Sequence, residues 1–172
     1  TFLPGVKIPD AIDIVTETDP TVDIVVLAVP SHVMRSVVQQ HPYSPTTIRV
    51  SVAKGIENET LMRMDEVIHE VTGPCPVVVL SGPSHAEEVA RELPASVCAA
   101  STDSAACEAV QQAFQSPYFR VYTTPDIIGV ELGGSLKNVV AIAAGVSDGF
   151  ELGDNAKSAL VTRGLAEISR LG

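Results

Sequence analysis

The segment TVDIVVLAVPSHVMRSVVQQ, residues 21–40, decides the fold class of this chain. Its first half, TVDIVVLAVP, is a nearly continuous Val/Ile/Leu run, which is typical of a strand buried on both faces in a parallel sheet. From Ser31 onward the apolar residues Val33, Met34, Val37 and Val38 share one face of a helix. A buried strand followed directly by a helix is the repeating unit of α/β folds. We therefore expect an α/β chain.

The same alternation continues to about residue 125. Further strands are expected at TTIRVSVAKG (46–55), PVVVLS (76–81), ASVCAAS (95–101) and FRVYTT (119–124), with a weaker indication at AIDIVTET (11–18). One intervening helix is expected to begin at an Asn58 cap and to end at Gly73 and Pro74. A second is expected to open with the S-x-x-E capping box of Ser84 and Glu87, and a third to span 102–115. The pattern predicts a doubly wound sheet covered on both faces.

The pattern changes after Pro125. Apolar residues in TPDIIGVELGGSLKNVVAIAAGVSDGF (124–150) have the spacing of a long, mostly buried helix, and DNAKSALVTRGLAEISRLG (154–172) is a second helix whose apolar face needs a partner surface. We therefore predict a partial dinucleotide-binding domain over 1–125 and the start of a helical domain over 126–172.

Composition excludes several classes of function. Eleven basic against 21 acidic residues give a net charge of −10, which repels nucleic acids. The 172 residues are 45% hydrophobic with a mean hydropathy of +0.26, yet contain no run of 18 apolar residues, so we expect a soluble protein without membrane insertion. The three cysteines include no CxxC pair, which predicts neither a disulfide framework nor a metal site and favours a reducing cytoplasm. Because the chain begins with Thr1 rather than Met, we expect that the true start is missing.

Candidate site residues gather where predicted strands end. In doubly wound sheets, ligands bind where helix N-termini collect beside strand ends, and three such junctions occur here: AVPSH (28–32), VAKGI (52–56) and LSGPSHAEE (80–88). Lys54, followed by Gly55, can extend over the sheet edge toward a phosphate or a carbonyl, although a solvated lysine would fit the same spacing. The third junction offers a Gly-Pro turn and two hydroxyls, or simply a helix start.

The second candidate is Lys137, because small residues accompany it on one helix face: Gly133, Gly134, Ala141 and Ala144. A small substrate could approach a lysine there, and burial would lower its pKa toward the range that a proton donor and acceptor needs. The alternative is a lysine that extends from a helix edge into water. Asn138 shares another face with Glu131 and could orient a substrate hydroxyl or support the lysine.

A rival interpretation comes from the turn GPSHA, residues 82–86, which resembles the G-x-S-x-G nucleophile elbow of hydrolases. Ser84 would then be a nucleophile and would need a histidine later in the chain, but the last histidine is the adjacent His85. The triad therefore fails within this sequence. No G-x-G-x-x-G or Walker A motif occurs either, so no phosphate-cradling loop can be assigned.

Taken together, these segments resemble, in order and over nearly the whole chain, the bacterial-type NAD(P)-dependent glycerol-3-phosphate dehydrogenases. The matching segments include LPGVKIP, DIVVLAVPS, SVAKGIE, LSGPSHAEEVA and ELGGSLKNVVAIAAG. The resemblance implies a cytoplasmic oxidoreductase of glycerol-3-phosphate metabolism and phospholipid biosynthesis, which interconverts sn-glycerol 3-phosphate and dihydroxyacetone phosphate with NAD or NADP. It implies that Lys137 is the general acid/base with Asn138 as its partner, that Lys54 contacts substrate and cofactor, that Gly82 and Ser84 bind substrate, and that Ser31 and Ala86 lie beside the cofactor.

The departures from the family pattern are equally informative. The family has a first βαβ unit with a glycine-rich loop before LPGVKIP, and further helices with an acidic residue and a phosphate-binding arginine after ISRLG. The resemblance therefore implies a fragment with a partial Rossmann-like sheet, which we expect to be inactive alone. Its exposed central edge would favour a homo-oligomer. Two alternatives remain: a non-catalytic binding or assembly module, and a fragment of another β-hydroxyacid-type dehydrogenase.

Overall fold

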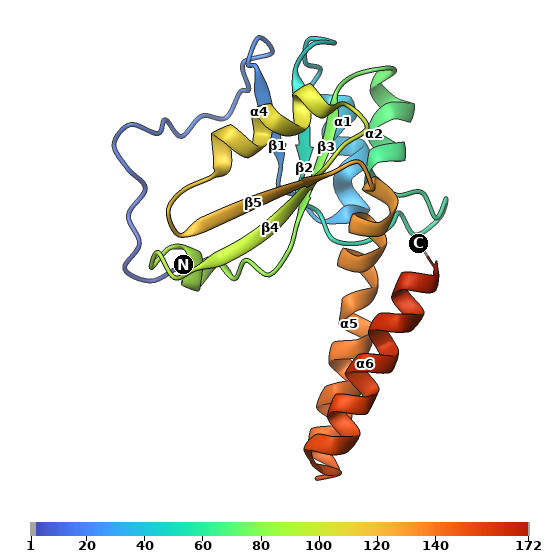
Figure 1. Cartoon of the computed structure of the whole chain (residues 1–172). Helices are drawn as coiled ribbons and strands as arrows, with labels where there is room; N and C mark the ends of the chain where they lie inside the picture. The colour runs from blue at the N-terminus through green and yellow to red at the C-terminus, as the bar shows by residue number, and fades with distance from the viewer. Residues whose placement is uncertain (1–2, 172) are drawn as a thin grey trace.

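The chain folds around one five-stranded sheet, as the computed structural model describes for residues 3–171. Two long helices extend away from this sheet as a hairpin (Figure 1). The strands lie side by side in sequence order: β1 (Ile24–Leu27), β2 (Ile48–Ser51), β3 (Val77–Ser81), β4 (Ala95–Ala100) and β5 (Phe119–Thr124). The predicted α/β class, with helices following the sheet, is confirmed. The opening segment 11–18 forms no strand, so the weaker indication there was wrong.

Strand direction departs from the all-parallel sheet expected from the apolar runs. Strands β1, β2 and β3 are parallel, but β4 runs antiparallel to β3, with Ser81 opposite Cys98, and β5 is parallel to β4. The reason lies in the connection between β3 and β4. It contains only α3 (Ala86–Val89), one turn with no buried residue, whereas a parallel crossover requires a helix that packs across the sheet. The chain therefore turns back beside β3.

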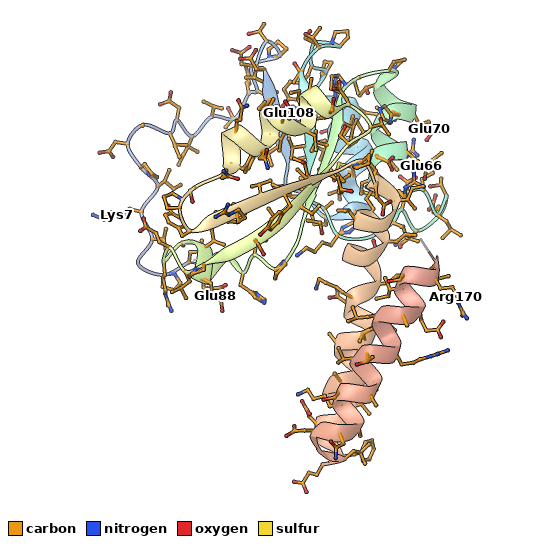
Figure 2. The ribbon with its side chains drawn as sticks, viewed as in Figure 1. Lys7, Glu66, Glu70, Glu88, Glu108 and Arg170 are labelled. Carbon is orange, nitrogen blue, oxygen red and sulfur yellow. The ribbon has the colours of Figure 1, made fainter. Side chains whose placement is uncertain are left out.

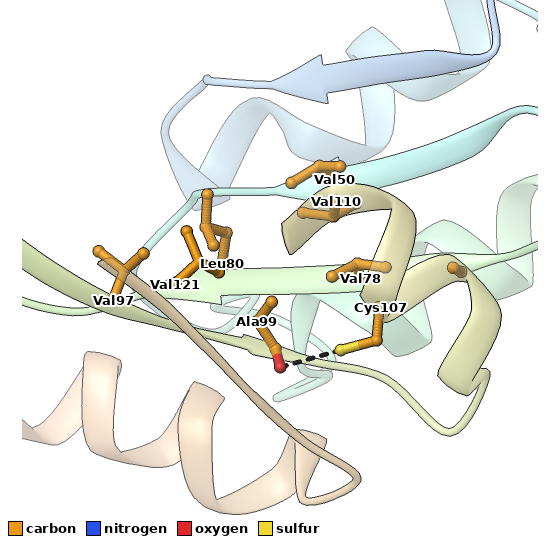
Figure 3. Packing of buried hydrophobic residues seen from close by; sticks show 9 residues of the cluster. Val50, Val78, Leu80, Val97, Ala99, Cys107, Val110 and Val121 are labelled. Carbon is orange, nitrogen blue, oxygen red and sulfur yellow. Dashed lines mark hydrogen bonds between the residues drawn. The ribbon is translucent and has the colours of Figure 1, made fainter. Parts of the chain in front are cut away.

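Helices cover both faces of the sheet. On one face α4 (Ser104–Phe114) packs over Val78 and Leu80, and Cys107 donates its thiol hydrogen to the carbonyl of Ala99 at 3.0 Å (Figure 3). On the other face, the intervening residues Val77 and Val79 contact α1 (Met34–Gln40), α2 (Met64–Thr72) and the start of α5 (Ile127–Gly149). This alternation along β3 is why its residues read as an unbroken apolar run.

Two predicted helix starts were wrong. Helix α2 begins at Met64 with Arg63 as its N-cap, not at Asn58, and Leu61 adopts a positive φ of 59° in the intervening turn. The Ser84 and Glu87 box does not form, since His85 precedes α3 and no side chain caps it. The predicted end of α2 is confirmed, because Gly73 takes a φ of 74° there.

The helical hairpin consists of α5 and α6 (Gly153–Leu171), which pack against each other. We expected α5 to be mostly buried, and this was wrong: only Ile127, Glu131 and Ser147 are buried along it. By length and hydropathy α5 could cross a membrane, but these criteria do not distinguish such a helix from an ordinary core helix. Pro125 lies between β5 and α5, and the division into two domains there stays a prediction.

The sheet has an open edge at β1. In the described part of the chain only β2 pairs with β1, and Val26 is 42% exposed. The expected exposed edge is therefore present, whereas association through it stays a prediction.

Candidate functional site

A cavity of about 410 Å³ lies where the carboxyl ends of β2 and β3 meet the first turns of α5. Lys54 reaches it from the segment after β2, and the turn 82–85 borders it after β3. From the helix side it is lined by Gly133, Gly134 and Lys137. Two of the three junctions that the sequence singled out thus meet the small-residue face of α5 in one place.

Lys54 is held at the cavity edge by its ammonium, which donates to the carbonyl oxygen of Gly82 at 3.4 Å. Partial burial lowers the pKa of Lys54, and the positive charge of Lys137 lowers it further. Neither lysine has an ion-pair partner among residues 3–171. Two ammonium groups that line one cavity without carboxylate partners make this cavity suited to an anion.

Lys137 differs from expectation because it is exposed rather than buried. Its ammonium donates to the side-chain oxygen of Asn138 at 2.7 Å, which holds the lysine along the helix surface. The reason is that α5 extends past the sheet after its first turns, so this part of the helix faces open solvent on the cavity side. Both lysines are thus exposed at the cavity.

Glycines set how closely α5 approaches the sheet. A Cβ atom at Gly134 would lie 2.9 Å from the Ser81 hydroxyl oxygen, whereas one at Gly133 would meet nothing within 4 Å. Gly82 has a φ of 156°, and a Cβ there would lie 2.8 Å from the carbonyl oxygen of Ser96. Gly134 and Gly82 thus permit close packing, while Gly133 leaves the cavity open.

A second, larger cavity of about 700 Å³ adjoins the first and shares Lys54, Ser81, Gly82 and Ser84 with it. Its other walls are apolar and come from the ends of several strands and from helices α3 and α4: Ala28, Val29, Pro30, Val52, Ala53, Leu80, Ala86, Val89, Ala90, Val97, Phe114 and Phe119. Charge is therefore confined to the side that the two cavities share, at Lys54. No cluster of side chains suited to a metal ion occurs in the described residues.

The family models match both parts of the chain. Residues 1–107 match the N-terminus of NAD-dependent glycerol-3-phosphate dehydrogenase, and residues 126–172 match its C-terminus. The chain belongs to this family. In this member of the glycerol-3-phosphate dehydrogenase family, the first cavity joins the two matched segments, because it is lined by the turn 82–85 and by α5, whereas the second cavity is lined only by residues between 28 and 119.

Relatives within the family support the same placement. A glycerol-3-phosphate dehydrogenase [NAD(P)+] from a Thermoanaerobacter species is 53% identical over 97% of this chain, and one from Pelotomaculum thermopropionicum is 50% identical over 99%. The crystal structure of the enzyme from Coxiella burnetii is 40% identical and superposes with a TM-score of 0.82, covering 87% of this chain and 46% of that one. The chain spans about half the length of the curated relatives it matches, 52% and 51% of these two.

The structure brings most of the predicted site residues together. Lys54, Gly82, Ser84 and Lys137 line the first cavity, and Ala86 lines the second. Asn138 lies beside the first cavity through its bond to Lys137.

Ser31 lines neither cavity and instead packs at the second junction, where a Cβ at Gly55 would lie 2.8 Å from its hydroxyl oxygen.

Sequence reasoning did not assign His85 and Cys98 to the site, although both line the first cavity. His85 could have been found as the residue next to Ser84. Cys98 could not, because it reaches the cavity only through the antiparallel register that places it opposite Ser81.

Proposed function

We propose that this chain carries the substrate-side residues of a glycerol-3-phosphate dehydrogenase, which interconverts sn-glycerol 3-phosphate and dihydroxyacetone phosphate. The observation that supports this most directly is the pair of unpaired ammonium groups of Lys54 and Lys137 in one cavity at the strand ends. A small phosphorylated ketone or alcohol has the charge and size for about 410 Å³.

In the proposed mechanism Lys137 exchanges a proton with the substrate's central oxygen. As the ketone is reduced, that oxygen develops negative charge, and the ammonium stabilises the charge while it donates the proton. Lys54 adds a second positive charge, and Asn138 holds the Lys137 ammonium through the 2.7 Å bond. Gly82 and Ser84 bind the substrate from the turn after β3.

NAD or NADP, when bound, supplies or accepts the hydride. Lys54, Ala86 and the apolar walls of the second cavity would hold its nicotinamide end, with Ser31 at the edge of the neighbouring junction. This sequence has no glycine-rich loop, so no residue here is assigned to the pyrophosphate.

The non-catalytic alternative is a binding or assembly module that keeps the fold. The apolar second cavity adjoins the first cavity, which the two lysines line. This arrangement favours the catalytic proposal, because an assembly module has no need of lysines without ion-pair partners beside an apolar cavity. We propose further that the 172-residue chain alone is inactive or nearly so, since hydride transfer needs a cofactor fixed about 3–3.5 Å from the reacting carbon.

The proposal is tested in a chimera in which this chain replaces the matching half of a full-length relative. NADH or NADPH oxidation with dihydroxyacetone phosphate is followed, and Lys137→Ala is expected to lower kcat by about 100-fold or more, the range of one acid/base group. Lys157→Ala is the matched control, because Lys157 forms an exposed ion pair with Asp148 on the same hairpin. Full activity of the Lys137 variant would contradict the assigned role.

A further inference from the structure

A buried charged cluster joins α5 to the start of α2. Glu131 of α5 is only 7% exposed, and its two carboxylate oxygens accept hydrogen bonds from different donors. The backbone N–H of Asp65 donates at 3.1 Å and the Nε of Arg63 at 3.2 Å. Because Asp65 lies in the first turn of α2, the carboxyl group of one helix caps the N-terminus of another. Burial, followed by the hydrogen bond and charge of Asp65, raises the pKa of this carboxyl group to about 8.

Arg63, which donates to Glu131, is itself held in place by neighbouring carboxylates. Arg63 donates to both carboxylate oxygens of Asp65, at 3.1 and 3.2 Å. Its backbone N–H donates to Glu66 at 2.9 Å, and its guanidinium forms an ion pair with the same carboxylate at 3.2 Å. Figure 2 shows Glu66 beside the first turns of α5. The guanidinium that meets Glu131 is therefore held by two carboxylates of its own helix.

No other side chain of α5 hydrogen-bonds the sheet or its covering helices within residues 3–171. The remaining contacts of α5 with the sheet are packing contacts without hydrogen bonds, mainly Ile127 and Val130 against Val79 and Ala100, together with Gly134 against Ser81. Apolar contacts are not directional, so they leave the rotation of a helix about its axis weakly determined. The Glu131 contact is directional.

Helix geometry connects this contact to the cavity. Gly134 comes three residues after Glu131, and Lys137 comes six residues after it. Lys137 therefore lies about 9 Å further along the helix axis than Glu131 and about 120° around the axis from it. Glu131 faces α2 while Gly134 and Lys137 face the cavity. Any rotation or sliding of α5 at Glu131 would therefore move Lys137 relative to Lys54.

We propose that Glu131 is a positioning residue for the cavity: by capping α2 it sets the rotation and height of α5, and so the placement of Lys137 against Lys54. The inference deepens the proposed function, because it concerns the same site. It predicts that loss of the Glu131 contact changes the surroundings of Lys54, a residue that Glu131 does not touch.

The test uses the whole chain without substrate. Its four lysines, Lys7, Lys54, Lys137 and Lys157, are labelled with ¹³C-methyl groups and titrated by NMR. In Glu131→Ala, which removes both oxygens of the contact, the pKa of Lys54 should rise toward the ordinary lysine value, because partial burial and repulsion from Lys137 both weaken when α5 shifts. Asp148→Ala is the matched control: it removes a carboxylate from the same helix at an exposed ion pair, and it should leave Lys54 unchanged.

An unchanged Lys54 pKa in folded Glu131→Ala would overturn the proposal. If that variant does not fold, Arg63→Lys takes its place, since it keeps the charge but loses the fork that meets Glu131 and Asp65. A rise at Lys54 in Arg63→Lys supports the proposal and no rise overturns it. The titration needs no substrate, so its result is independent of the chimera assay.

Discussion

Gly134 offers a sharp test of how closely α5 must lie against the sheet. An alanine Cβ there would stand 2.9 Å from the Ser81 hydroxyl oxygen, whereas a Cβ at the adjacent Gly133 would meet no atom within 4 Å. Replacing glycine by alanine in a helix is worth about 1 kcal/mol in favour of folding. Overpacking costs about 1–3 kcal/mol. We therefore expect Gly133→Ala to stabilise the chain by up to about 1 kcal/mol and Gly134→Ala to be neutral or to destabilise it by up to about 2 kcal/mol.

The assay is urea unfolding of both variants, followed by circular dichroism. The difference of about 1–3 kcal/mol between them corresponds to about 5- to 150-fold in the unfolding equilibrium. Ser81→Ala provides the control, because removing the hydroxyl should recover part of the loss in the double variant with Gly134→Ala but not change the effect of Gly133→Ala. If both glycine variants stabilised the chain equally, the close approach of α5 to β3 would be refuted.

Two further predictions concern parts of the fold away from the cavity. Asp103 caps α4 by accepting from the Ala106 N–H at 3.1 Å, so Asp103→Ala should lower the free energy of unfolding by about 1 kcal/mol in the same urea assay, and an unchanged midpoint would contradict the cap. Hydrogen bonds from Arg35 and then Thr60 hold the pKa of Glu57 at about 2, below its ordinary 4.5. Because the folded pKa is lowered, the stability that this carboxylate contributes is present above about pH 4.5 and is lost as the pH falls toward 2. Glu57→Gln should therefore be less stable than the parent chain at pH 7, with a gap that narrows at pH 3, and a gap of constant size would exclude this origin.

The sequence predicted the elements that form the site better than their directions. The positions of the five strands were predicted correctly because a buried apolar run and a turn signal are both local, whereas the helix starts expected at Asn58 and Ser84 were wrong. The antiparallel direction of β4 was not predicted. Strand direction depends on whether α3 is long enough to cross the sheet, and the residues at the start of α3 do not indicate that it ends after four residues. For the same reason the position of Cys98 in the cavity was not predicted, because it follows from the antiparallel pairing of β4 with β3.

The error about Lys137 has a different physical origin. A strip of small residues beside a lysine has the same sequence whether it faces a packed core or an open cavity, and only the path of α5 beyond the sheet decides between them. Local spacing therefore predicted the cavity face correctly and the burial of the lysine incorrectly.

The Glu131 cluster shows why positioning contacts are the hardest part of a site to predict. Arg63 and Glu131 are separated by 68 residues. The backbone N–H of Asp65 has no partner within its own helix, and so can donate to Glu131, only because α2 begins at Met64. Had Asn58 capped that helix, as its residue type indicates, the first turn would have been satisfied locally and the carboxylate would have had no place to bind. The late start of α2 therefore provides the donor N–H to which Glu131 of α5 binds. The placement of Lys137 depends, through Glu131, on where another helix begins.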